Sequence, residues 1–201
     1  MAKPGAREGG SARGERTREA FLEAARATLI EEGFARTSAR SIAERAGVSQ
    51  ASVFYHFESV PDLLLAVLDA VSTRRKDAFA AAIESARTPR ELLAVGRRIL
   101  AGDAASGDTR VLVEIIAGSH SVAGMPAKVA ERLAPWEELA ADVVRRTIPR
   151  PLRSRVNART AGHGLAALVL GLELLGSLRG PHDAPPDVLA GLSELAGEGD
   201  R

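Results

Sequence analysis

Between positions 37 and 56 the chain gathers hydroxyl, amide, imidazole and guanidinium side chains at the spacing of two short helices. Gln50 can pair with adenine through two hydrogen bonds, and the methyl group of Ala51 can contact a thymine methyl. Arg40 can take a phosphate or reach a guanine, and the hydroxyls suit phosphate oxygens. These side chains together favour DNA binding. The candidate DNA-binding residues are Thr37, Ser38, Arg40, Ser49, Gln50, Ala51, Ser52, Tyr55 and His56.

Two short helices with a tight turn between them must position these side chains. Ser38 can cap the first helix, Gly47 can end it, and Ser49 can cap the second helix two residues later. Val48 and Val53 are expected to fill the angle between the helices. The second helix would then present its outward residues to a major groove. Residues 38–57 are therefore predicted to form a helix-turn-helix.

Composition and charge limit the class of protein. The 201 residues are 45% hydrophobic and 26% charged, as in an ordinary globular protein. The 27 basic and 26 acidic side chains nearly cancel, so DNA would have to meet a local basic patch. The absence of cysteine excludes disulfides and thiolate metal sites. We find no secretory signal and no apolar run long enough for a membrane span, and therefore expect a cytoplasmic protein without a membrane partner.

The remaining sequence has helix caps, apolar stripes and Gly or Pro breaks, and no period-two strand, which predicts an all-α fold. Residues 1–14 carry four glycines and three basic side chains and are expected to form a flexible basic arm. A loop is expected over residues 102–108, with Asp108 capping the next helix, and Pro135 is expected to kink its helix near Glu131. Helices are predicted over residues 15–32, 59–83, 88–100, 108–116, from 125 onward, 153–178 and 186–196.

The first third of the chain resembles the TetR-type bacterial transcriptional regulators. The resemblance covers residues 15–75 and rests on EEGF, TSARSIAERAGVS, VFYHF and SVPDLLLAVLDA. It implies an all-α homodimer with an N-terminal three-helix DNA-binding domain over residues 15–75. A C-terminal helical domain, residues 76–201, would bind a small ligand and dimerise through its last two long helices.

Two positions depart from the pattern of that family. Phe54 stands where the family usually has tyrosine, and Val60 stands where it often has lysine. The resemblance implies that both family residues contact phosphate, so this chain lacks one hydroxyl and one cationic anchor. A shallower dependence of DNA binding on salt is expected, because each missing cationic contact lowers the log–log slope by about one unit.

The C-terminal half is less distinctive. Trp136, beside Pro135, together with His120 and His163, forms the candidate ligand-binding set, although Trp136 would equally serve as core filler and each histidine as a structural residue. Few aromatic residues follow position 60, so a pocket would be mainly aliphatic. Six arginines between positions 145 and 159 form either a solvated rim or an attractor for an anion.

Dimerisation is predicted through an apolar stripe on residues 153–178. The stripe contains Leu165, Leu168, Leu172 and Leu175, with Gly164, Gly171 and Gly176 leaving room for another helix. A final helix over 186–196 would supply the matching edge. Two such helices from each chain would form a two-fold four-helix interface.

The sequence as a whole favours a sequence-specific DNA-binding regulator, most simply a repressor released from a palindromic operator by a small, mainly apolar ligand. No metal site or cofactor is expected, because the four histidines are scattered and glycine-rich phosphate loops are absent. An all-α enzyme is a rival class, but the chain has no GxSxG elbow. A ligand-independent architectural DNA-binding protein is a second alternative, and activation rather than repression stays open.

Overall fold

The computed structural model describes residues 8–86, 88–148 and 154–178. Helices form almost all of these ranges, and no strand occurs within them, so the all-α prediction is confirmed. The elements are α1 (Glu8–Glu32), η1 (Phe34–Arg36), α2 (Ala39–Ala46), α3 (Gln50–His56), α4 (Val60–Ser85), α5 (Pro89–Ser106), α6 (Asp108–Ser119), α7 (Met125–Thr147) and α8 (Ala158–Ser177).

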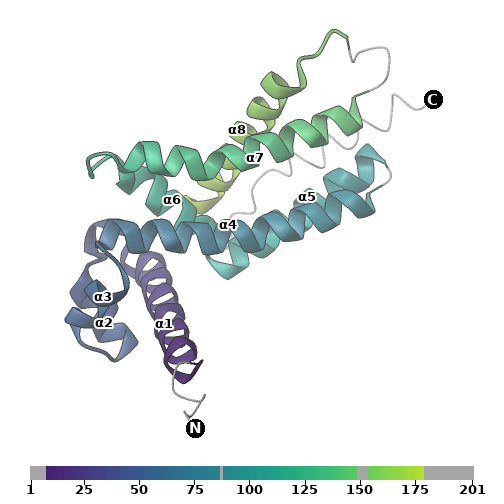
Figure 1. Cartoon of the computed structure of the whole chain (residues 1–201). Helices are drawn as coiled ribbons and strands as arrows, with labels where there is room; N and C mark the ends of the chain where they lie inside the picture. Colours follow the sequence, from purple (N-terminus) through teal and green to yellow (C-terminus); the bar gives the residue numbers. More distant parts are fainter. Residues whose placement is uncertain (1–7, 87, 149–153, 179–201) are drawn as a thin grey trace.

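The first three helices gather at one end of the molecule (Figure 1). The long helix α4 starts beside them and runs away toward the other end, where α5 returns alongside it. Helices α7 and α8 pack on each other more extensively than any other pair in the described chain, and they lie on the opposite side of α4 from α1. Helix α6 contacts α1 and α4 and also α7 and α8, so it lies between the first helices and the α7–α8 pair.

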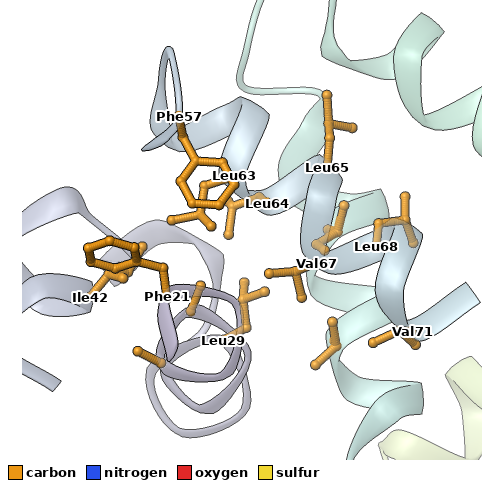
Figure 2. Close-up of a cluster of buried hydrophobic side chains, with 14 of the residues drawn as sticks. Phe21, Leu29, Ile42, Phe57, Leu63, Leu64, Leu65, Val67, Leu68 and Val71 are labelled. Atoms are coloured by element: carbon orange, nitrogen blue, oxygen red, sulfur yellow. The ribbon is translucent and has the colours of Figure 1, made fainter. Parts of the chain in front are cut away.

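One hydrophobic core runs from the first three helices into the rest of the chain (Figure 2). Phe21, Ile42 and Phe57 meet the buried face of α4, which continues through Leu68 to Val71. Side chains of α6 extend the same cluster. The domain boundary predicted at residue 75 therefore falls within the continuous helix α4, and the two predicted domains share core contacts.

The first helix begins at Glu8, so the prediction that residues 8–14 belong to a flexible arm is wrong for that segment. Adding residues to an existing helix costs far less than starting one, although each glycine weakens it by about 1 kcal/mol relative to alanine. A side-chain bond supports this turn, because Thr17 Oγ1 donates to the carbonyl of Arg13 at 2.9 Å. Residues 1–7 of the predicted arm lie outside the described residues.

The predicted loop over residues 102–108 is also wrong in extent. Helix α5 continues through Gly102 to Ser106, and the connection to α6 is the single residue Gly107. Gly107 has φ of +79°, a left-handed conformation that strongly favours glycine. An isolated glycine inside a helix costs about 1 kcal/mol, which the surrounding helix can tolerate, so Gly102 does not end α5.

Two further helices differ in detail from the predictions. Helix α7 continues through Pro135 as one helix; Glu131 is exposed, so water can reach the carbonyl that proline leaves without a donor. Whether α7 bends there stays a prediction. Helix α8 begins at Ala158, where Asn157 Oδ1 accepts hydrogen bonds from two backbone amides at 3.0 and 3.1 Å. The prediction that this helix begins at residue 153 is wrong for residues 154–157, which are described and not helical, and the helix predicted over 186–196 lies outside the described residues.

No single helix in the described part of the chain is long and apolar enough to cross a membrane. Helices α3 and α4 together have the required length and composition, but they are bent by 65° at their junction. The apolar side chains of α4 are already used, because they form the centre of the core in Figure 2.

Candidate nucleic-acid interface

Local hydrogen bonds fix the beginning and end of α2. Ser38 Oγ accepts from the amide of Ser41 at 3.1 Å, and Ser41 Oγ accepts from the amide of Ser38 at 2.9 Å. At the other end Gly47 is left-handed, with φ of +68°, and its amide donates to the carbonyl of Glu44 at 3.3 Å. These reciprocal caps hold α2 at a defined length and direct the chain into α3.

One face of α3 is buried and the other is open to solvent. Val53 is fully buried in the core cluster, which fixes the rotation of α3 about its axis. Gln50, Ala51, Phe54 and Tyr55 are exposed, and Tyr55 has 85% of its surface open. At 100° per residue these four positions fall on one side of the helix. Helix α3 therefore presents amide, methyl and aromatic groups together, as major-groove readout requires.

An arginine attaches α2 firmly to the end of α1. Arg45 Nε donates to Thr28 Oγ1 at 3.1 Å, and its two terminal nitrogens donate to the Glu31 carboxylate at 3.0 and 2.5 Å. Hydrogen bonding to Arg45 holds the pKa of the Glu31 carboxyl below its usual value. The bidentate pair orients the helix-turn-helix against α1, so the exposed face of α3 keeps a fixed direction.

The predicted DNA-binding residues differ in how freely they can reach DNA. Ser49 occupies the N-cap position of α3, but its side chain makes no capping hydrogen bond. Arg40 is exposed and its Nε donates to Glu44 at 2.8 Å. Ser38 is committed to the cap, and Thr37 is buried with its hydroxyl donating to the Gly33 carbonyl at 2.8 Å. For these residues DNA contact stays a prediction, and it is weakest for Thr37.

Ser52 and His56 lie at the edge of the exposed face. Both are half-buried, and the His56 ring packs at 5.6 Å from the Phe21 ring and at 5.2 Å from the Tyr55 ring, measured between centroids. The His56 ring thus packs between the buried Phe21 ring and the exposed Tyr55 ring. Both residues are placed to reach a backbone phosphate beside the groove, and those contacts also stay predictions.

Two side chains near the turn differ from expectation. Val48 is 39% exposed, so the prediction that it fills the angle between α2 and α3 is wrong. Val53, predicted to share that position, is fully buried. Because Val48 directly follows the left-handed Gly47, the chain reverses and carries its side chain outward. Phe54, considered above only for its missing hydroxyl, is 51% exposed beside Gln50. Helix α3 has seven residues, about two turns, which is too few for sequence alone to show which of its faces is exposed.

A buried carboxylate joins this DNA-binding unit to the rest of the chain. Asp108, at the start of α6, is 2% exposed and accepts from Arg26 Nε of α1 at 3.0 Å and from an Arg74 terminal nitrogen of α4 at 2.6 Å. Arg26 also donates to the carbonyl of Ser106. The N-cap position of α6 is Gly107 rather than Asp108, so the predicted capping role is wrong. The carboxylate instead binds three helices together.

A second contact from α6 to the DNA-binding unit is made by Glu114, six residues after Asp108. Glu114 Oε2 accepts from the amide of Phe34 at 2.8 Å, at the start of η1. The Phe34 ring lies directly over Gly118, where an added Cβ would come within 2.1 Å of Phe34 Cγ. Glycine is therefore required at this crossing, where α6 contacts the segment that follows α1.

The candidate ligand-binding residues occupy different surroundings. Trp136 of α7 is half-buried, with its ring centroid 5.7 Å from that of Phe79 and 5.4 Å from the guanidinium carbon of Arg75. His163 is exposed and its Nδ1 lies 3.1 Å from a Glu137 carboxylate oxygen. His120 is exposed at the end of α6. Ligand contact by all three stays a prediction, and Trp136 is the member with interior surroundings.

The sequence did not predict a buried ion pair between α4 and α8. Arg75 of α4 and Glu173 of α8 form an ion pair with exposures of only 6% and 7%.

An open groove between α1 and α4, about 130 Å³ in volume, lies beside Arg26 and Arg74. It is smaller than the roughly 300 Å³ at which most ligand pockets begin. None of the three predicted ligand residues lines this groove.

The arginine run predicted between positions 145 and 159 is described only in part. Arg145 and Arg146 lie in the last turn of α7, where positive charge complements the helix dipole, and Arg145 pairs with Asp142. Arg155 and Arg159 are exposed near the start of α8, and Arg150 and Arg153 lie outside the described residues. The four described arginines are exposed, as a solvated rim requires.

The capped α2, the left-handed turn and the exposed face of α3 define an all-α protein with a helix-turn-helix. Residues 21–67 match the family model described as bacterial regulatory proteins, tetR family. This match covers the helix-turn-helix and the start of α4, and it confirms the resemblance noted in the sequence.

Relatives of known sequence and structure agree with this assignment. The protein Rv2912c of Mycobacterium tuberculosis, described as an uncharacterized HTH-type transcriptional regulator, is 33% identical over 109 residues, which are 54% of this chain and 56% of that protein. The chain thus aligns with little more than half the length of this curated relative. A crystal structure from Rhodococcus sp., described as a TetR-family transcriptional regulator, superposes with a TM-score of 0.71 at 21% identity, over 90% of this chain and 98% of the other. The multidrug binding protein EbrR, solved with imidazole, gives 0.65 at 25% identity, over 92% and 89%.

Proposed function

We propose that this chain is a cytoplasmic, dimeric transcriptional regulator that represses by binding a palindromic operator and is released by a small organic ligand. The observation that carries the proposal is the exposed face of α3, where Gln50, Ala51, Phe54 and Tyr55 stand together on a helix fixed by buried Val53. The match of residues 21–67 to the family model of bacterial regulatory proteins supports DNA as the partner. Both relatives are described as transcriptional regulators, which supports regulation as the function of this chain.

Exposed apolar surface on α8 supports dimerisation. Leu168, Leu175 and Leu178 have 39%, 56% and 76% of their surfaces open, and they recur along one stripe of the helix. Gly164 and Gly171 lie on the same stripe, and an added Cβ at either would meet no atom within 4 Å. Such a stripe can accept the equivalent helix of a second copy at close range. A two-fold dimer would place two α3 helices about 34 to 36 Å apart on adjacent major grooves.

Helix α4 supports a route from ligand to DNA. It begins next to the helix-turn-helix, packs on α1 through Val67 and Val71, and carries Arg74 to the Asp108 junction. A ligand that displaces α4 would therefore move α1 as well, and the spacing of the two α3 helices would change. The ligand must bind the DNA-incompetent arrangement more tightly to have this effect. The similarity to EbrR, a multidrug binding protein, supports a small organic molecule as the effector.

The proposal is tested by selecting bound fragments from sheared genomic DNA with the purified full chain, followed by footprinting of the recovered sites. Two inverted half-sites centred about 10 to 10.5 base pairs apart are expected. Broad protection without a shared sequence would contradict the proposal and favour an architectural protein. Turnover of small molecules without a defined DNA site would favour an enzyme.

Two variants of α3 then separate base reading from backbone contact. Gln50→Ala is expected to relax preference at one base pair in each half-site by about 1 to 3 kcal/mol. Tyr55→Phe is expected to weaken binding to all sequences alike, because it removes one hydroxyl from an exposed ring. Both side chains are exposed, so neither change should alter folding. Glu138→Ala, an exposed change on α7, is the matched control. A uniform loss from both α3 variants would contradict the assignment.

A further inference from the structure

Helix α3 and the residues that follow it carry few cations for a surface that meets DNA. No lysine or arginine occurs in the sequence between Arg45 and Arg74. On α2, the guanidinium groups of Arg40 and Arg45 are already paired with acidic side chains. Cations that neutralise phosphates supply a large share of the affinity for duplex DNA. A cation beside the C-terminal end of α3 therefore has to come from another part of the chain.

Helix α1 supplies such a cation. Arg18 lies one turn before Phe21, on the side of α1 that faces the core. The ring of Phe21 lies against both His56 and Phe57, with centroid distances of 5.6 and 6.3 Å. The guanidinium carbon of Arg18 lies over the Phe57 ring, 5.2 Å from its centroid, within the range of a cation–π contact. Because Phe57 directly follows α3, this contact holds Arg18 at the end of that helix.

The Arg18 side chain has hydrogen-bond donors to offer an anion. It is exposed, and it forms no ion pair with any residue that the structure describes. The acidic residues nearest to it or to Phe57 in the sequence, Glu15, Glu19 and Glu58, are exposed as well. Contact with an aromatic ring uses none of the N–H donors of a guanidinium, so those donors remain available. Their planar arrangement suits the oxygens of a phosphate.

We infer that Arg18, Tyr55 and His56 form one binding cluster for a phosphate of the DNA backbone at the C-terminal end of α3, with Arg18 as its cation. The rings of Tyr55 and His56 pack edge-on at 5.2 Å, and Phe21 joins His56 to the side of α1 that carries Arg18. Guanidinium, phenol and imidazole groups thus lie beside the exposed face of α3. This inference rests on the proposed function, because it names an anchor by which the same surface holds DNA.

An anchor of this kind strengthens binding to every sequence. Phosphates carry no base identity, so contacts to them fix the position of the protein on the duplex without selecting bases directly. Loss of Arg18 should therefore weaken operator and random-sequence DNA together and leave the base preference of Gln50 unchanged.

The dependence of DNA binding on salt tests the charge of the cluster. Binding of the full chain to labelled duplexes is followed by fluorescence anisotropy between about 50 and 200 mM potassium chloride, with the footprinted operator and with a random duplex of equal length. Arg18→Leu keeps an apolar contact with Phe57 but removes the charge, and it should lower the log–log slope by about 0.9 for each bound protomer. Over this range of salt each protomer should then lose about 3.5-fold less affinity than in wild type.

Three further variants separate phosphate binding from other effects. Arg146→Leu removes the same charge from the exposed last turn of α7, at the far end of the molecule from α3 in Figure 1, and should leave the slope unchanged. Arg18→Lys keeps a cation and should retain most of the slope. Urea unfolding of the same proteins reports a structural role, which would lower the stability without changing the slope. If Arg18→Leu fails to fold, Arg18→Gln takes its place.

Neutral methylphosphonates placed singly in the operator locate the contact. Wild type should lose affinity at one phosphate of each half-site where Arg18→Leu loses no more. An unchanged slope in folded Arg18→Leu, or an equal decrease in Arg146→Leu, would overturn the inference.

The proposed function fails separately from this inference. A slope that depends on Arg18 with random duplex, in a chain without a defined footprint, would retain the phosphate cluster and reject the sequence-specific regulator. A defined footprint with a slope independent of Arg18 would do the reverse. Absence of binding to any duplex would reject both.

Discussion

Replacing Asp108 with asparagine should substantially lower the free energy of unfolding. Asp108 lies at the start of α6 with its side chain 3% exposed, and its two oxygens accept from Arg26 and Arg74. Asparagine keeps the shape of aspartate but removes the negative charge, and its amide group can turn only one acceptor oxygen toward two guanidinium groups. Both arginines would then lose part of their hydrogen bonding at a buried point.

The magnitude follows from the exposure of each partner. The Arg26 side chain is 18% exposed, so its bond to Asp108 is worth about 1.5 to 3 kcal/mol, as for hydrogen bonds to buried charged groups. The Arg74 side chain is 60% exposed, and solvent screening limits its share to about 1 kcal/mol or less. Removing one partner of a fully buried pair costs about 3 to 5 kcal/mol, and partial solvation here reduces that figure. We expect Asp108→Asn to lower the unfolding free energy by about 2 to 4 kcal/mol.

Urea unfolding of the two proteins at equal concentration measures this difference. Asp142→Asn is the matched control, because Asp142 pairs with Arg145 on the surface with both side chains more than half exposed, and it should cost about 0.5 kcal/mol or less. A double-mutant cycle of Arg26→Ala with Asp108→Asn should return a coupling energy of about 1.5 kcal/mol or more. A loss for Asp108→Asn no larger than that for Asp142→Asn would refute the reasoning.

Two further predictions concern the DNA and dimer surfaces. Val60→Lys restores the cation of the family pattern at the start of α4, and it should steepen the log–log dependence of operator affinity on salt by about one unit per protomer, with an unchanged slope counting against a phosphate contact there. Leu168→Glu combined with Leu175→Glu charges the exposed stripe of α8 and should give monomers by sedimentation with much weakened operator binding, whereas a double variant that still sediments as a dimer would exclude this stripe from the interface.

The helix-turn-helix could be predicted from sequence because its determinants are local. Ser38, Gly47 and Ser49 lie within twelve residues, and each signals a cap or a left-handed turn by residue type alone. The order and approximate limits of most helices follow from the same kind of signal. The predicted helix ends are wrong where glycine only weakly disfavours a helix that is already formed. Gly102 inside α5 and the glycines near the start of α1 are examples.

The charged contacts that organise the interior could not be predicted in this way. Asp108 bonds to residues 82 and 34 positions away, and Arg75 to a residue 98 positions away. In the sequence Asp108 resembles an ordinary helix cap, and Glu173 looks like a single polar interruption of an apolar run. Pairing at such distances depends on how helices cross, and residue type and spacing carry no record of it. The exposure of Phe54 on α3 and of Val48 in the turn before α3 was unpredicted for a related reason, because it depends on how the short helices pack.

The buried Asp108 junction sets the difference in affinity that a ligand needs in order to release the protein from DNA. A ligand shifts an equilibrium only by the difference in its affinity for the two states, and each tenfold difference is worth about 1.4 kcal/mol. If the DNA-incompetent state breaks the Asp108 junction, the ligand must supply the 2 to 4 kcal/mol that we assign to it, a difference in affinity of roughly 30- to 1000-fold. Asp108→Asn weakens the hydrogen bonds to Arg26 and Arg74 in advance, so it should lower the affinity difference that the ligand must supply. Asp108→Asn should therefore be released from operator at lower ligand concentration than wild type, while its ligand-binding residues stay the same.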